Sequence, residues 1–176
     1  MLDSILLSIH KEIISFAKTE DQFLSNHLNK GIFFMPEIAF VYGVGKAIMS
    51  KYKEIFLDHK VEWLREIRLE KGGPCDLIFD VENAGKIVIE FKVRSTLEAY
   101  SQDVQKLKYL IGDNATRLFC ALSNVFEKDL PADLRIKRLE DEYSSSIQRV
   151  GDLYNFPTWD VYAHPIYCVI GFWKIQ

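Results

Sequence analysis

Three ionisable residues in one short stretch are the strongest candidates for chemistry in this chain. Asp76, Glu90 and Lys92 lie in two runs rich in β-branched and aromatic residues, and these runs flank Asn83-Ala84-Gly85. Two such runs around a short polar loop predict a β-hairpin. Because side chains alternate between the faces of a strand, a three-residue loop places all three ionisable side chains on one face. We therefore expect two carboxylates and one ammonium to converge at one end of the hairpin.

The loop also predicts a register for the hairpin. A three-residue loop commonly ends with a residue in the left-handed conformation, which glycine adopts without strain, and Gly85 occupies that third position. With this loop, Asp76 is expected to face Lys92, and Ile78 to face Glu90. Residues that face each other directly have Cβ atoms about 5 Å apart.

Residue types and spacing leave two interpretations of this group open. In the first, the group is a solvated surface patch in which Lys92 bridges two acids, a contact that contributes only about 0–1 kcal/mol to stability. In the second, the neighbouring Ile78, Phe79 and Val88 bury the group in part, where unpaired charges are costly. Carboxylates gathered in such a place hold a cation, and hard cations such as Mg²⁺ prefer oxygen ligands.

The same residues resemble the signature of the PD-(D/E)xK nuclease superfamily. The matching residues are Pro74 and Asp76, followed by Glu90-Phe91-Lys92, and one residue separates Pro74 from Asp76 where the motif has them adjacent. The resemblance implies that Asp76, Glu90 and the backbone carbonyl of Phe91 bind Mg²⁺ or Mn²⁺. It implies that Lys92 orients or deprotonates the attacking water. The implied activity is hydrolysis of phosphodiester bonds, most often in DNA.

The resemblance also implies further site residues outside the hairpin. Glu37, in the first turn of a predicted helix, is the candidate for a third acidic residue, with a favourable interaction with the helix dipole as the alternative. Glu66, in the strand predicted over residues 61–69, is a rival for this position, although we interpret it as a solvated edge residue. Gln102 or Gln105, on the helix after the hairpin, is a candidate substrate contact, with plain solvent exposure as the alternative.

Hydrophobic periodicity predicts the elements that position these residues. A helix over 36–53, the strand over 61–69, the hairpin, a helix over 97–111 and a strand over 116–124 follow one another along the chain. This order matches the αβββαβ core of the superfamily. We thus expect an α/β protein with a restriction-endonuclease-like core over residues 36–124, built on a central mixed sheet flanked by helices.

The segments on either side of this core are predicted to complete a single domain over residues 1–176. Residues 1–35 are expected to form two helices, one over 3–18 and a shorter one that ends near Gly31. Residues 125–176 are expected to form an extension with a helix over 132–149 and a final strand over 167–173.

Composition excludes several classes of protein. The net charge is −3, from 22 basic and 25 acidic residues, which argues against tight sequence-independent binding of nucleic acid through many cations. It does not exclude an enzyme whose cations line one cleft. Three distant cysteines and four scattered histidines argue against a zinc site or a disulfide framework. No apolar run approaches the roughly 20 residues of a membrane span, and the N-terminus does not resemble a signal peptide, so a cytoplasmic protein is expected.

Three functions remain open on the sequence. The first is a metal-dependent nuclease that acts on nucleic acid, as the resemblance implies. The second is a catalytically inert module of the same fold that serves as a nucleic-acid- or protein-binding subunit. The third is an unrelated α/β interaction domain in which the trio is only a salt-bridged patch. Assembly into a homodimer or a larger complex is compatible with each.

Overall fold

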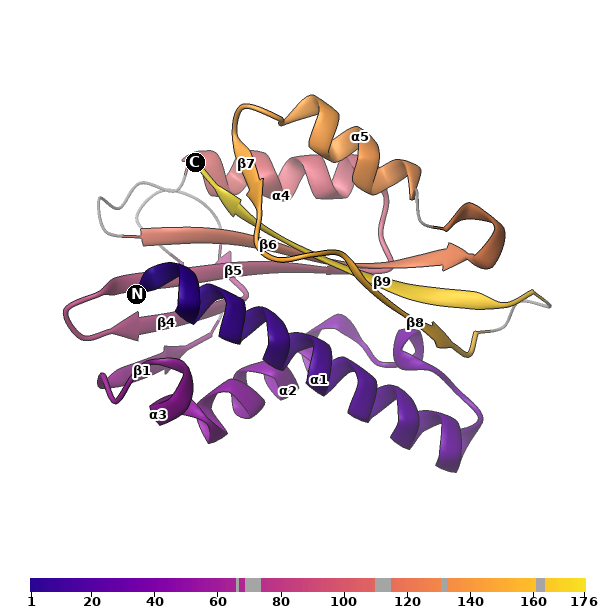
Figure 1. Cartoon of the computed structure of the whole chain (residues 1–176), viewed down its shortest axis with the longest axis horizontal. Coiled ribbons are helices and arrows are strands. Elements are labelled where there is room, and N and C mark those ends of the chain that lie inside the picture. The colour runs from indigo at the N-terminus through magenta and orange to yellow at the C-terminus, as the bar shows by residue number, and fades with distance from the viewer. Residues whose placement is uncertain (66, 69–73, 110–114, 131–132, 161–163) are drawn as a thin grey trace.

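A mixed seven-strand sheet lies at the centre of the computed structural model, with N-terminal helices on one face and further helices on the other (Figure 1). The structure describes all residues except 66, 69–73, 110–114, 131–132 and 161–163. The helices are α1 (Leu2–Leu28), η1 (Ile32–Phe34), α2 (Glu37–Ser50), α3 (Tyr52–Ile55), α4 (Leu97–Tyr109), η2 (Glu127–Asp129) and α5 (Leu134–Glu142). The strands are β1 (Val61–Leu64), β2 (Ile67–Arg68), β3 (Pro74–Cys75), β4 (Leu77–Val81), β5 (Gly85–Val93), β6 (Ala115–Phe126), β7 (Ile147–Arg149), β8 (Tyr154–Thr158) and β9 (Ile166–Ile175).

The order of the strands in the sheet is β1-β4-β5-β6-β9-β7, and β8 pairs with β9 beside this path. Strands β5 and β6 run parallel and are joined through α4, while the other neighbours are antiparallel. The predicted succession of helix, strands, helix and strand is therefore confirmed. The single strand predicted over 61–69 is wrong, because β1 ends at Leu64 and β2 pairs with β3 in a separate two-stranded sheet. The C-terminal segment is an integral part of the sheet, because β9 pairs with β6 along ten residues. The short strands β7 and β8 were not expected from the sequence.

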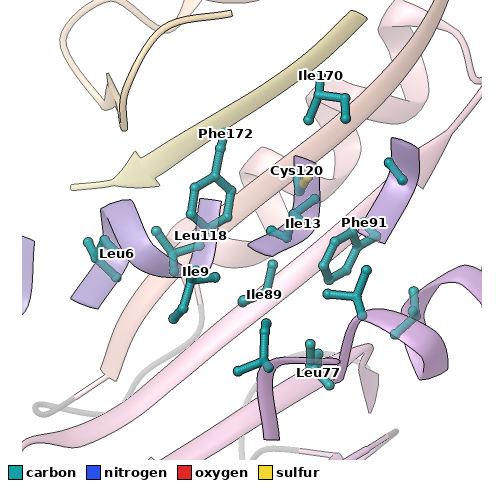
Figure 2. Close-up of a cluster of buried hydrophobic side chains, with 14 of the residues drawn as sticks. Leu6, Ile9, Ile13, Leu77, Ile89, Phe91, Leu118, Cys120, Ile170 and Phe172 are labelled. Carbon is teal, nitrogen blue, oxygen red and sulfur yellow. The ribbon is translucent and has the colours of Figure 1, made fainter. Parts of the chain in front are cut away.

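Apolar side chains fill the space on both faces of the sheet, so the core has two parts. One part packs α1 and α2 against the odd-numbered residues of β5, such as Ile89 and Phe91. Figure 2 shows this cluster, with Ile9 of α1 and Leu118 of β6 beside them. The other part packs Val88 and its neighbours against α4 and α5. A strand buried on both faces has a continuous apolar sequence, as the middle of β5 does.

The hairpin register differs from the predicted one. The loop again has three residues, but they are 82–84, and Val81 pairs with Gly85. Ile78 consequently faces Val88 and not Glu90. The reason is the turn, in which the Ala84 N–H donates to the Val81 carbonyl and Asn83 takes a positive φ of 64°. Asparagine tolerates this conformation better than most residues, so the turn closes one residue earlier.

The predicted pair of N-terminal helices is wrong, because α1 is one continuous helix from Leu2 to Leu28. No proline or glycine interrupts this segment, and its apolar stripe continues through Ala17 to Leu24. Asp21 is buried and accepts hydrogen bonds from the Ile32 N–H and from the Thr158 hydroxyl. These bonds fix the C-terminal part of α1 against the chain that follows it and against β8.

The predicted helix over 132–149 is also wrong in its extent. The helix α5 ends at Glu142, and its N-terminus is capped by Asp133, whose carboxylate accepts from the N–H groups of Arg135 and Ile136. The following Ser144-Ser145-Ser146 forms a turn before β7. Serine competes for backbone hydrogen bonds and favours turns over helix interiors, which accounts for the early end.

Candidate carboxylate and lysine site

The candidate site lies where β5 extends past its pairing with β4. The pairing between these strands ends at Ile89, and Asp76 lies at a bend just before β4. Beyond this point Asp76 Oδ2 accepts from the Phe91 N–H at 2.8 Å, and Glu37 Oε2 accepts from the Val93 N–H, also at 2.8 Å. Two carboxylates thus take the place of strand carbonyls along this part of β5. They are brought there by the bend and by the first turn of α2.

Glu90 lies buried beside these acids with a lysine as its counter-ion. Only 2% of Glu90 is exposed, and Lys106 of α4 places its Nζ 2.6 Å from Glu90 Oε1. The same ammonium donates to the carbonyl of Pro74 at 2.5 Å. Burial, and then the charge of Asp76, raise the pKa of Glu90 to about 7 against the opposing effect of Lys106. The Glu90 carboxylate therefore lies in a place where a positive charge is strongly favoured.

Lys92 is held between two acids that come from opposite faces of the sheet. Its Nζ lies 3.1 Å from Asp103 Oδ2 of α4 and 3.8 Å from Glu37 Oε1 of α2. Burial favours the neutral amine, but the charges of Asp103 and Glu37 outweigh it and raise the pKa of Lys92. The side chain is therefore an ammonium at neutral pH, fixed by two carboxylates at the end of β5.

A small open hollow gives access to two of these acids, Glu37 and Asp76. Its volume is about 120 Å³, and it is lined by Glu37, Ile38, Val41, Arg65 and Asp76. Asp76 and Glu37 are thus reached from outside.

Five of the residues predicted for the site lie together in the structure, four through their side chains and Phe91 through its backbone. Asp76 and Glu90 are close enough to influence each other electrostatically, and Glu37 and Lys92 form an ion pair. The backbone N–H of Phe91 joins this group by donating a hydrogen bond to Asp76.

The two glutamine candidates are placed elsewhere. Gln105 donates to the hydroxyl of Tyr143 at the end of α5, at 3.1 Å, and Gln102 is exposed on α4. Their substrate contacts stay a prediction. Glu66 lies outside the described residues.

Two residues of the site, Asp103 and Lys106, were not anticipated from the sequence. Each directly precedes a residue of the apolar stripe of α4, namely Val104 and Leu107, so each lies at the border of the face that packs on the sheet. This periodicity was a usable signal, because residues at the border of a buried stripe are the ones that reach a neighbouring strand. The glutamines were named because of their chemical type, whereas position on the helix decides which side chains reach β5.

The donor set fits a hard cation bound with several waters. Among the described residues, no group of three or more His, Cys, Asp or Glu is arranged to hold a metal ion. Mg²⁺, however, is commonly bound by one or two carboxylates, with water and substrate oxygens completing its shell. Asp76, Glu90 and the Phe91 carbonyl would supply such a partial set. Cys75 is not suited to a thiolate site, since burial, followed by Glu90, raises the pKa of its thiol to about 12.

Comparisons with known proteins add no relative from which a function could be transferred. No protein-family model, no curated protein and no solved structure matches the chain. The functional proposal consequently depends on the residues and their arrangement. None of the helices in the described parts of the chain has the length and apolarity that crossing a membrane requires.

Proposed function

We propose that this protein is a divalent-metal-dependent nuclease of the restriction-endonuclease-like type, which hydrolyses phosphodiester bonds in DNA. The observation that carries the proposal is the convergence of Asp76, buried Glu90 and Lys92 at the end of one central strand. The hairpin register differs from the predicted one, yet these residues still meet. Their types and order along the chain are those of the PD-(D/E)xK motif, and the strand and helix order agrees with an αβββαβ core.

The metal would be held by Asp76, Glu90 and the backbone carbonyl of Phe91. When bound, Mg²⁺ or Mn²⁺ supplies a lowered pKa for a water molecule and neutralises charge on the phosphate. Asp76 uses Oδ2 for the Phe91 N–H, and this hydrogen bond orients the carboxylate. Glu90 is paired with Lys106 at 2.6 Å, so a lysine provides the positive charge that the buried carboxylate requires before a metal arrives.

Lys92 would act on the attacking water or on the charge that develops at phosphorus. The ion pairs with Asp103 and Glu37 hold its ammonium near the carboxylates, and a fixed positive charge stabilises a transition state without reorganisation. Glu37 holds the Val93 N–H with one oxygen and faces Lys92 with the other. It would therefore position Lys92 and bind water that reaches the hollow.

The alternative, an inert module that binds nucleic acid or protein, is supported by the same contacts. Asp76 and Glu37 already accept hydrogen bonds from the backbone of β5, and Lys106 already balances the charge of Glu90. A purely structural cluster of this kind would bind divalent cations weakly or not at all.

The two functions are separated by variants that remove charge and preserve shape. We expect Asp76→Asn and Glu90→Gln to lose Mn²⁺ binding in calorimetry and to lose cleavage of linear, circular and single-stranded DNA. The amide oxygen introduced by Asp76→Asn can still accept from the Phe91 N–H, so the fold should be kept. Asp80→Asn is the matched control, because Asp80 forms a partly exposed pair with Lys86 at the other end of the hairpin. Equal Mn²⁺ heats and equal cleavage in wild type and all three variants would contradict the proposal.

A further inference from the structure

An exposed apolar surface adjoins the candidate site. Ile38 and Tyr42 of α2 are 59% and 49% exposed, and Phe34 of η1, which precedes α2 in the chain, is 58% exposed. Ile38 and Tyr42 are four residues apart on α2 and so share one face of that helix. Ile38 also lines the hollow, together with Glu37 and Asp76, which makes the apolar surface continuous with the carboxylates.

Two exposed aromatic rings, Tyr42 on α2 and Phe34 in the preceding η1, each carry a cation. The guanidinium of Arg65 lies over the ring of Tyr42, 5.0 Å from its centroid, and Lys30 Nζ lies 5.8 Å from the centroid of Phe34. The Tyr42 ring is further supported by Trp63 of β1, with ring centroids 5.6 Å apart. Arg65 therefore brings positive charge to a supported ring at the rim of the hollow.

This combination of groups suits one kind of partner. Unstacked bases bind on aromatic rings and on guanidinium planes, and the neighbouring cations meet the phosphates. A duplex hides its bases and is bound mainly through many lysine and arginine contacts to phosphate, which a chain of net charge −3 is poorly equipped to make. The surface is therefore better matched to a single strand than to a duplex.

We propose that Phe34, Ile38, Tyr42 and Arg65, which we call the stacking face, bind the unstacked bases of single-stranded DNA and lead its backbone to the carboxylates. This inference rests on the proposed nuclease function, which explains why the strand is brought to the carboxylates. The binding itself does not require cleavage. It assigns the substrate class as single-stranded DNA, or as the frayed or unpaired part of a longer molecule.

The test measures the binding of a fluorescein-labelled single strand by fluorescence anisotropy. The strand has about 20 nucleotides, long enough to span a typical single-strand site. A duplex of the same sequence is measured in the same way. Each measurement is run once with EDTA and once with Ca²⁺. We expect wild type to bind the single strand at least about tenfold more tightly than the duplex. Phe34→Ala and Tyr42→Ala should each weaken single-strand binding by about tenfold, as expected for losing one stacking partner. Tyr42→Phe retains the ring and should bind like wild type.

The control is Phe23→Ala, which removes an aromatic ring of α1 that is 55% exposed and lies outside the stacking face. It should leave binding unchanged, and thermal melts should show all variants folded, since the substituted side chains are exposed. Wild-type affinity in both Phe34→Ala and Tyr42→Ala, a preference for duplex, or no binding of either DNA would overturn the inference. Single-strand binding without cleavage in Mg²⁺ or Mn²⁺ would overturn the nuclease proposal alone. Cleavage that is indifferent to Phe34→Ala and Tyr42→Ala would overturn the stacking face alone.

Discussion

Substitution of Lys92 best distinguishes a catalytic role of the site from simple charge balance. Replacing it with Met keeps most of the side-chain stem and removes the ammonium that lies 3.1 Å from Asp103. We expect Lys92→Met to bind Mn²⁺ at least as well as wild type, because a competing positive charge is gone. Cleavage should fall by about 100-fold or more, as for the loss of a general base or an electrostatic stabiliser. The measurement is Mn²⁺ titration beside Mn²⁺-dependent cleavage, and undiminished cleavage would remove Lys92 from the mechanism.

Lys106 should contribute most to the stability of the fold when no metal is present. Lys106→Met leaves the carboxylate of Glu90 buried without its counter-ion, and we expect a loss of about 1–3 kcal/mol in the free energy of unfolding, measured by urea denaturation in EDTA. Lys86→Met is the control, because the ion pair of Lys86 with Asp80 is partly exposed and should contribute little.

Added Mn²⁺ should stabilise Lys106→Met more than it stabilises wild type, since the cation would take over the charge of the missing lysine. A variant as stable as wild type in EDTA would mean that Glu90 does not depend on Lys106.

Among single residues, the sequence predicted Glu90 and Lys92 on one face of a strand and named Glu37 as a further candidate. It did not predict their partners on α4. Alternation along a strand is a local property, so Glu90 and Lys92 follow from the pattern alone. Lys106 and Asp103 become partners only when α4 docks on the sheet, and docking depends on the whole packed face. Chemical type led to Gln105, whose side chain instead contacts Tyr143.

Among the elements, the β4–β5 hairpin places Asp76 near the site and can be tested at its turn. Gly85 has a φ of 85°, as expected from the sequence, and a β-branched residue there is strained. Gly85→Val should lower the free energy of unfolding by more than about 1 kcal/mol, as measured by denaturant titration. Asn83→Gly is the control, because glycine adopts the positive φ of 64° at that position readily and should cost little. A Gly85→Val protein as stable as wild type would show that this conformation is not required.

The hairpin also explains why element types were predictable and their exact pairing was not. Apolar alternation and a glycine turn predict two strands and a loop of three residues. Both Asn83 and Gly85 can take the left-handed conformation, and both do, so composition alone does not decide where the loop starts. The loop length kept the even-numbered side chains on one face, so Asp76, Glu90 and Lys92 lie close together despite the shift of register.

For the molecule as a whole, packing of α1 on β9 ties the two ends of the chain together through a buried histidine. His10 is 4% exposed and stacks on Phe172, with ring centroids 5.6 Å apart. Burial lowers the pKa of His10, and the nearby Asp152 opposes this only in part. Below the ordinary pKa of 6.5 the unfolded chain takes up a proton that the folded protein does not, so stability falls as the pH falls.

We expect His10→Phe to remove this dependence. Between about pH 7.5 and 5.5, a window around the ordinary histidine pKa, wild type should lose stability relative to the variant, no more steeply than about 1.4 kcal/mol per pH unit. The measurement is a series of urea denaturation curves for both proteins across this range. Parallel curves of stability against pH would mean that His10 titrates in the folded protein much as it does in the unfolded chain.

The two carboxylates that cap β5 have a further consequence for how this protein behaves at high concentration. Free N–H groups along an unpaired stretch of strand are a template on which the strand of another chain can add. Asp76 and Glu37 occupy the N–H groups of Phe91 and Val93, and their negative charges repel the carbonyls of an incoming strand. Loss of both side chains would therefore invite association between copies of the chain. The same two carboxylates would then influence both self-association and catalysis, so substitution of Asp76 or Glu37 would change both properties.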